Sequence, residues 1–237
     1  MKKFIIANFK MYKSPKDCVS YAKSLVKLVK KSKNDIAVCP SFVCIESMAK
    51  VLRKSKVLCG AQNSANNLEG AFTGEVSPKM IKDAGAELVI LGHSERRRYY
   101  GETDKLINEK LKLVLENNLI GVVCLADDGG EDYRENIKKQ LKDLLRGVTI
   151  FENVVIAFEP VWAIGTGKTM ELKQIDTVLG FIKKELKKKF SDQIRVLYGG
   201  SVNASNASQI LELSNVDGLL VGGASKDYIQ FAKICNS

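Results

Sequence analysis

The segment LVILGH, residues 88–93, is a short apolar run that ends in the only histidine of the chain. It lacks the polar alternation of a strand with one face in water, so both of its faces should be covered by protein. Seven other runs are equally short and rich in Ile, Val and Leu. The eight predicted strands are residues 4–10, 36–41, 57–62, 88–93, 122–126, 154–160, 194–200 and 218–223.

Longer segments with helical periodicity separate these runs. Apolar residues return every three or four positions in residues 14–31, 105–118, 135–146 and 171–190. Ser14-Pro15 and Ser77-Pro78 read as an N-cap followed by proline in the first helical turn.

Strands that alternate with helices imply parallel βαβ units, because parallel pairing needs a crossover. Eight such units in 237 residues favour an α/β fold with a closed (β/α)₈ barrel over an open doubly wound sheet. No linker or change in composition divides the chain. We therefore expect one domain over residues 1–237.

The composition, 45% hydrophobic and 27% charged residues with a net charge of +10, is that of a soluble globular protein. Many lysines recur at helical spacing, as on the solvated faces of amphipathic helices, and the aromatic and arginine pattern of a nucleic-acid surface is missing. No apolar stretch reaches the roughly 20 residues of a membrane span, and the N-terminal run is too short for a signal peptide. We expect a cytoplasmic protein that binds neither nucleic acid nor membrane, with polyanion binding by the basic surface as the alternative.

The six cysteines are scattered, mostly inside apolar runs, and form no C-x-x-C motif. A single histidine cannot complete a Cys/His zinc site. Buried free thiols in a reducing compartment are therefore expected at Cys18, Cys39, Cys44, Cys59, Cys124 and Cys235.

The active site of such a barrel lies at the carboxyl ends of its strands. Asn8 and Lys10 end the first predicted strand, His93 and Glu95 follow the fourth, and Glu159 ends the sixth. Each alone has a plain structural interpretation, such as a surface lysine, a structural histidine or a helix-capping glutamate. Together they would place an ammonium, an imidazole and a carboxylate on one rim.

Glycine pairs follow the last two strands, at residues 199–200 and 222–223. One pair is as well explained by a tight turn, but two at consecutive strand ends favour a phosphate site, since glycine lets the backbone approach a ligand closely.

Glu159 opens the segment EPVWAIGTGKT, whose apolar residues and glycines are typical of a lid over a site. A carboxylate desolvated by such a lid is a stronger base. A base, an imidazole donor and a phosphate site suggest proton abstraction next to a carbonyl on a small sugar phosphate.

These residues closely resemble the triosephosphate isomerase family. The matching stretches are ANFK (7–10), LGHSERR (91–97), AFEPVWAIGTGKT (157–169), YGGSV (198–202) and GGAS (222–225), in the family's order and over essentially the whole chain. The resemblance implies a TIM barrel that interconverts dihydroxyacetone phosphate and D-glyceraldehyde 3-phosphate through an enediol(ate), in glycolysis and gluconeogenesis. It implies no cofactor and no metal.

The resemblance also implies roles for individual residues. Glu159 would move the proton, His93 would polarise the carbonyl as a neutral imidazole, and Lys10 would stabilise the enediolate. Substrate would be bound by Asn8, Lys10, Gly165, Ser201, Gly222 and Gly223, with Glu95 and Tyr198 in support and residues 160–168 as the lid. Lys10 is the expected partner of Glu95. A homodimer is implied, in which the loop at residues 62–78, with Thr73 near its tip, enters the neighbouring subunit.

The chain departs from the family pattern in a few places. Phe9 stands where the family commonly has Trp, and Ala126-Asp127 replaces the usual Gly-Glu. The shorter Asp127 would change how Trp162 of the lid is held.

Two alternative functions remain: a Schiff-base aldolase using Lys10, and a non-catalytic protein that binds nucleic acid or membrane.

Overall fold

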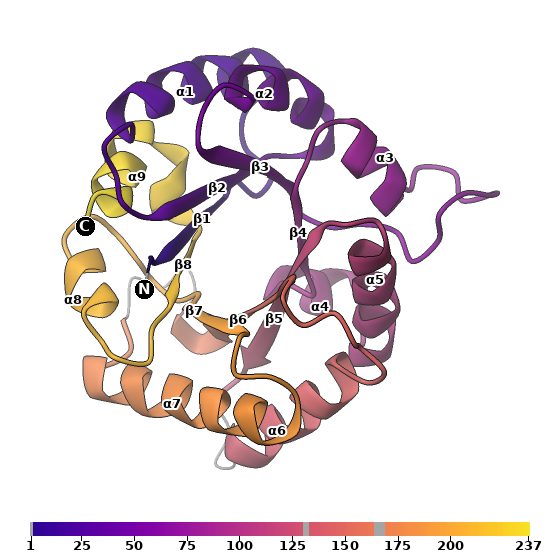
Figure 1. The fold of residues 1–237 in the computed structure, drawn as a ribbon, viewed down its shortest axis with the longest axis vertical. Coiled ribbons are helices and arrows are strands. Elements are labelled where there is room, and N and C mark those ends of the chain that lie inside the picture. Colours follow the sequence, from indigo (N-terminus) through magenta and orange to yellow (C-terminus); the bar gives the residue numbers. More distant parts are fainter. Residues whose placement is uncertain (1, 130–132, 164–168) are drawn as a thin grey trace.

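In the computed structural model, which describes residues 2–129, 133–163 and 169–237, eight parallel strands close into a barrel (Figure 1). Strand order around the barrel follows chain order, and β1 pairs with both β2 and β8. The strands are β1 (Phe4–Asn8), β2 (Asp35–Cys39), β3 (Val57–Ala61), β4 (Leu88–Leu91), β5 (Ile120–Asp127), β6 (Val154–Pro160), β7 (Arg195–Tyr198) and β8 (Gly218–Val221). The predicted (β/α)₈ barrel is confirmed.

Helices surround the barrel on its outside (Figure 1). They are α1 (Pro15–Leu28), α2 (Ile45–Leu52), α3 (Pro78–Asp83), α4 (Ser94–Tyr100), α5 (Asp104–Glu116), α6 (Tyr133–Leu144), α7 (Leu172–Lys189), α8 (Ala207–Leu211) and α9 (Tyr228–Cys235), with short 3-10 helices η1 (Phe42–Cys44), η2 (Val161–Ala163) and η3 (Gly223–Lys226). The hydroxyl oxygens of Ser14 and Ser77 accept backbone N–H groups of α1 and α3, so both predicted N-caps are confirmed.

The strands bury two separate layers because successive side chains point to opposite faces. Phe4 and Ile6 belong to the cluster that fills the barrel interior, whereas Ile5 and Ala7 belong to the larger cluster between strands and helices. Both layers are apolar, which explains why the strands show no polar alternation in the sequence.

Gly218 lies opposite Phe4 in the pairing of β1 with β8. A Cβ atom at this position would lie 1.9 Å from the carbonyl oxygen of Phe4, the residue paired with it in the register. Only a residue without a side chain lets these two strands close the barrel.

Several predicted strands extend beyond the observed ones at their carboxyl ends. Lys10 has φ 51° and Gly92 has φ 67°, and both values lie in the left-handed region, which no strand contains. The chain therefore turns at these positions although their neighbours are apolar. β5, in contrast, is longer than predicted, because it pairs with β6 as far as Asp127 and Pro160.

All six cysteines are buried and free, as predicted. Burial raises the pKa of the Cys59 thiol to about 12 and that of the Cys235 thiol above its ordinary value. A thiol with a raised pKa forms little of the reactive thiolate at neutral pH.

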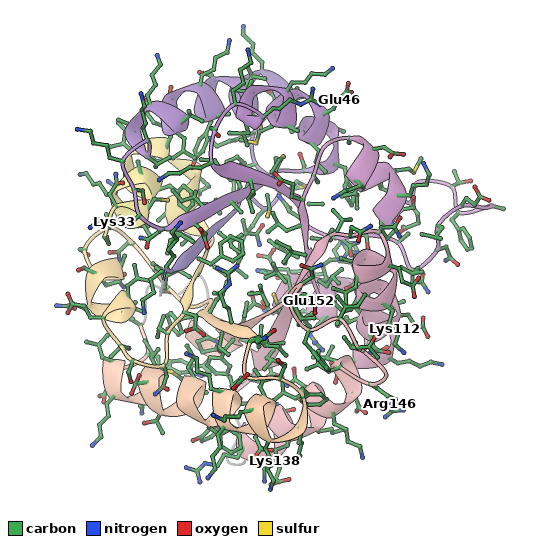
Figure 2. All side chains as sticks on the ribbon, in the orientation of Figure 1. Lys33, Glu46, Lys112, Lys138, Arg146 and Glu152 are labelled. Atoms are coloured by element: carbon green, nitrogen blue, oxygen red, sulfur yellow. The ribbon has the colours of Figure 1, made fainter. Side chains whose placement is uncertain are left out.

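The basic charge lies on the outside of the molecule. Figure 2 shows long cationic side chains, such as Lys33, Lys112 and Arg146, pointing outward. In the part of the chain that the structure describes, no helix is both long and apolar enough to cross a membrane.

Candidate active site

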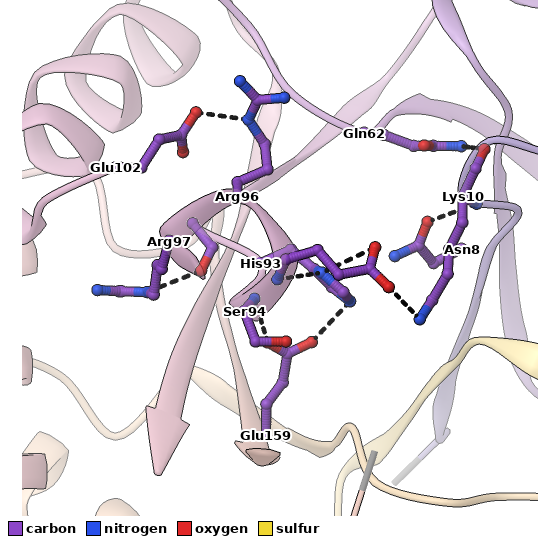
Figure 3. A network of polar contacts seen from close by, with 11 residues as sticks. Asn8, Lys10, Gln62, His93, Ser94, Arg96, Arg97, Glu102 and Glu159 are labelled. Carbon is purple, nitrogen blue, oxygen red and sulfur yellow. Dashed lines mark hydrogen bonds and ion pairs between the residues drawn. The ribbon is translucent and has the colours of Figure 1, made fainter. Parts of the chain in front are cut away.

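The carboxyl ends of the strands bring the predicted residues around one cavity of about 440 Å³. Lys10, His93 and Glu159 line it, so the predicted ammonium, imidazole and carboxylate come together (Figure 3). Its other lining residues include Asn8, Ser201, Gly222 and Gly223. Gly165, the remaining residue predicted to bind substrate, lies outside the described residues.

Glu159 is the penultimate residue of β6 and is deeply buried, only 1% exposed. Its Oε2 accepts the backbone N–H of Ser94 at 2.8 Å, and its Oε1 lies 3.0 Å from Nε2 of His93. A carboxylate without water needs such donors to remain charged. The first turn of α4 therefore supplies the hydrogen bonds that hold this side chain in place (Figure 3).

His93 is the N-cap of α4, and this position orients its ring. Its Nδ1 accepts the backbone N–H of Glu95 at 3.2 Å. A ring nitrogen accepts a hydrogen bond only when it carries no proton, so this contact requires a bare Nδ1. The other ring nitrogen, Nε2, lies 3.0 Å from Oε1 of Glu159 and is the atom that can donate to a ligand.

Lys10 is held at the start of the loop after β1 in a left-handed conformation. Its N–H donates to Oδ1 of Asn8 at 3.0 Å, and its carbonyl oxygen accepts from Nε2 of Gln62 at 2.9 Å. The same Gln62 amide donates to the carbonyl oxygen of Cys39. Several hydrogen bonds of this kind keep a strained non-glycine backbone in place at a functional site.

The ammonium group of Lys10 lies 2.6 Å from Oε1 of Glu95, the partner expected from the sequence. In this arrangement a carboxylate engages the side-chain nitrogen of Lys10. A Schiff-base lysine must instead be a neutral amine, so the arrangement does not favour the aldolase alternative.

The glycines after β7 and β8 leave room for the side chains of the site. A Cβ atom on Gly199 would lie 3.1 Å from Cγ of Glu159, and one on Gly222 would lie 3.3 Å from Cε of Lys10. Both contacts are tighter than an ordinary van der Waals contact, so a side chain at either position would displace the carboxylate or the ammonium.

Tyr198 lies beneath Gly200, and its hydroxyl would be 2.2 Å from a Cβ atom placed there. The ring is fully buried, and burial raises the pKa of Tyr198 to about 12. Tyr198 is thus protonated at neutral pH and fills the space under the second glycine of the turn.

Arg97 was not singled out in the sequence, although it lies in the LGHSERR stretch. Its Nε donates to the carbonyl oxygen of Gly92, one terminal nitrogen donates to the carbonyl oxygen of Cys124, and the other contacts Asp104. The guanidinium therefore ties the end of β4 to β5 and fixes the turn that carries His93 (Figure 3). The sequence gives no signal that distinguishes this arginine from one on the surface.

The predicted lid, residues 160–168, begins with the last residue of β6 and continues through η2; residues 164–168 lie outside the described residues. Trp162 is about two-fifths exposed and packs against Gly129, where a Cβ atom would lie 2.9 Å from the indole Cδ1. Asp127 accepts the N–H of Gly129 on Oδ1 at 3.3 Å, and burial raises the pKa of its carboxyl group. The turn after β5 thus contacts Trp162 through the backbone of Gly129.

Comparison with known proteins agrees with this geometry. The model of the family described as triosephosphate isomerase matches residues 3–237. Proteins named triosephosphate isomerase from Thermodesulfovibrio yellowstonii and Alkaliphilus oremlandii are both 41% identical to this chain, over 98% and 100% of both sequences respectively. The crystal structure of triosephosphate isomerase from Bartonella henselae is similar with a TM-score of 0.92 and 30% identity, over 99% of this chain and 98% of that one. The chain belongs to the triosephosphate isomerase family.

Proposed function

We propose that this protein interconverts dihydroxyacetone phosphate and D-glyceraldehyde 3-phosphate by proton transfer between adjacent carbons. The observation that carries the proposal is the buried carboxylate of Glu159 beside Nε2 of His93, on the wall of a cavity that ends in two glycine turns. Substrate and product are isomers, so no redox cofactor or second substrate enters the balance.

Glu159 is the base of the proposed reaction. It removes a proton from the carbon next to the carbonyl group, the C–H electron pair becomes the C=C bond of the enediolate, and the carbonyl electrons move to oxygen. The proton then returns to the neighbouring carbon. A positioned carboxylate of this kind contributes roughly 10²- to 10⁴-fold to a proton transfer.

His93 and Lys10 stabilise the charge that develops on oxygen. Nε2 of His93 lies 3.0 Å from Oε1 of Glu159. Substrate that enters between them takes a hydrogen bond from Nε2 on its carbonyl oxygen and leaves the carboxylate free to act on carbon. The imidazole can then pass a proton between the two enediolate oxygens, while the ammonium of Lys10 offsets their negative charge.

The phosphate group lies at the other end of the cavity in this proposal. The backbone around Ser201, Gly222 and Gly223 lines that end, and Gly165 of the lid completes the set that would hold it. Binding a group remote from the reacting carbons lets the site hold the substrate still while the proton moves.

We also propose that the chain is a single cytoplasmic domain that forms a homodimer. Residues 62–77, all of them described, contain no helix or strand, and Figure 1 shows this loop projecting from the barrel. A second cavity beside Lys10 is lined by the apolar residues Met11 and Phe42 and by Tyr100, and Met11 is 95% exposed. In this proposal the loop around Thr73 of a second copy enters this cavity. Sedimentation of the native chain and of a Thr73→Arg variant tests the dimer, because a buried arginine at the loop tip should shift it to monomer.

The activity is tested by measuring isomerisation of glyceraldehyde 3-phosphate by the native chain and by Glu159→Gln. The amide keeps the size of the side chain but cannot take a proton from carbon, so kcat should fall at least about 10²-fold. Glu152→Gln is the matched control, since Glu152 precedes the other end of β6 and is exposed. No activity in the folded native chain would refute the proposal. Borohydride labelling of Lys10 in the presence of substrate would support the aldolase alternative instead.

A further inference from the structure

The charged side chains around the site cavity do not by themselves attract an anion. The ammonium of Lys10 is paired with Glu95, and Glu159 adds a second carboxylate. Nδ1 of His93 accepts a backbone N–H, as described above, so His93 is not counted as a cation. Apart from Lys226, the charged side chains described here are two carboxylates and one ammonium, which leaves one negative charge in excess among the described residues, although the proposed substrate carries a phosphate dianion.

Lys226 supplies a second ammonium group to the wall of this cavity, in addition to that of Lys10. It ends η3, is exposed, and lines the cavity on the side of Gly222 and Gly223. Among the described residues that line the cavity, it is the one cation without a carboxylate partner. The neighbouring acid, Asp227, is engaged elsewhere, because its Oδ1 accepts the N–H groups of Ile229 and Gln230 at the start of α9.

The position of Lys226 is held by an aromatic ring. Its Nζ lies 4.3 Å from the ring centroid of Tyr12, which belongs to the loop after β1 and also lines the cavity. A cation over an aromatic face is attracted to the ring without being neutralised, unlike a cation in an ion pair. Tyr12 therefore keeps the ammonium at the mouth of the cavity with its charge available.

We propose that Lys226, held over Tyr12, is a positioning residue that draws the phosphate group of the substrate into the site. The inference rests on the proposed function and adds a residue to it. Lys226 offsets the excess negative charge of the cavity wall, so the dianion meets no net repulsion as it enters. It acts on the approach and placement of the phosphate, whereas Glu159 and His93 act on the reacting carbons and oxygen.

The size of the effect follows from the size of the cavity. A sphere of about 440 Å³ is about 9 Å across, so a phosphate anywhere in it lies within about one Debye length of the lysine at 0.1 M salt. Coulomb's law for one charge and a dianion at ~9 Å in water corresponds to about a fivefold change in an equilibrium or rate constant. Screening should reduce this to less than about twofold at 0.15 M ionic strength.

The test compares Lys226→Gln with Lys226→Arg and with Lys233→Gln across a range of ionic strength. Lys233 is an exposed lysine of α9 that lines none of the cavities described here, so its variant removes the same charge elsewhere. At low salt, Lys226→Gln should lose about fivefold in kcat/KM, more than in kcat, and the loss should vanish as salt is added. Lys226→Arg should keep most of the activity. Equal behaviour of Lys226→Gln and Lys233→Gln would overturn the inference.

Inorganic phosphate gives a readout that does not depend on catalysis. Its dissociation constant, measured by calorimetry at low salt, should rise by a similar factor in Lys226→Gln and not in Lys233→Gln. Tyr12→Leu should weaken phosphate binding by part of this factor and Tyr12→Phe should not, because only the former removes the ring. If the native chain were inactive but lost phosphate affinity in this pattern, the proposed function would fail and the role of Lys226 would stand. Unchanged phosphate affinity in Lys226→Gln would refute that role even in an active enzyme.

Discussion

The barrel should be sensitive to a single methyl group at Gly218. A Cβ atom there would lie 1.9 Å from the carbonyl oxygen of Phe4 and 2.7 Å from its carbonyl carbon and nitrogen. Ordinary contact begins at 3.4 Å, so β1 and β8 would have to separate by about 1.5 Å. The obstacle is backbone, which cannot rotate away as a side chain can.

The cost of Gly218→Ala can be worked from the contacts that this separation breaks. β1 and β8 are joined in register from Phe4↔Gly218 to Ala7↔Val221. Ladder hydrogen bonds contribute about 1 kcal/mol each, and the loosened packing around Phe4 adds to their loss, so the free energy of unfolding should fall by about 4 kcal/mol. For a chain of this length that corresponds to a fall in Tm of about 8 °C.

Gly121→Ala is the matched control, because it adds the same methyl group to another buried strand. There the added Cβ atom would meet Cδ1 of Leu111 at 2.3 Å, but the next neighbours lie at 3.8 Å. The end of a leucine side chain can move, so the cost should be only about 1–2 kcal/mol, or about 2–4 °C. Thermal unfolding followed by circular dichroism at one fixed protein concentration compares the two. If Gly218→Ala lost no more than Gly121→Ala, the account of barrel closure would be wrong.

Three further predictions concern the site and the thiols. Glu159→Asp draws the carboxylate back by about one C–C bond (~1.5 Å), so kcat should fall about 10²-fold or more, yet less than in Glu159→Gln, and steady-state kinetics of both variants would show it. An equal loss in the two would mean that the carboxylate is not the base. Because the pKa of Asp127 is raised in the folded state, its ionisation opposes folding. Asp127→Asn can still accept the N–H of Gly129, so it should be more stable than the native chain at neutral pH. This gain in stability should shrink as the pH falls through the raised pKa toward 3.8. Denaturant titrations from pH 4 to 8 measure the difference in stability, and a difference that stays constant with pH would contradict the prediction. A thiol reagent should label the native protein slowly and all six cysteines after denaturation, and rapid labelling of the native chain would show that a thiol is accessible.

The strands could be predicted because the same physical cause acts along all of them: both faces are buried, so each reads as an apolar run. The residues at which the strands end could not be predicted, because the chain leaves the sheet through left-handed turns at Lys10 and Gly92 that the hydrophobic pattern does not indicate. Helix α4 is a second element that the hydrophobic pattern does not predict. Its sequence, SERRRYY, carries no apolar stripe, and the helix begins there because the imidazole of His93 accepts a backbone N–H of its first turn.

The residues that line the cavity could be predicted from two premises, the barrel and the rule that sites lie at the ends of its strands. The residues that hold them could not. Gln62 and Arg97 act through backbone carbonyl oxygens of other loops, contacts that depend on the closed barrel and not on any spacing in the sequence. Lys226 looks like any of the many lysines of this chain until the fold places it over Tyr12.

The single histidine described above has a spectroscopic consequence. Every imidazole resonance in an NMR spectrum of this protein must come from the wall of the site cavity, because the chain has one histidine and it lies there. Isotope-labelled histidine should show one bare and one protonated ring nitrogen, corresponding to Nδ1 and Nε2 of His93. A molecule that enters the cavity and takes the Nε2–H should shift the second signal with no overlapping background. The protein thus contains its own site-specific probe, which can follow ligand entry without a label on the ligand.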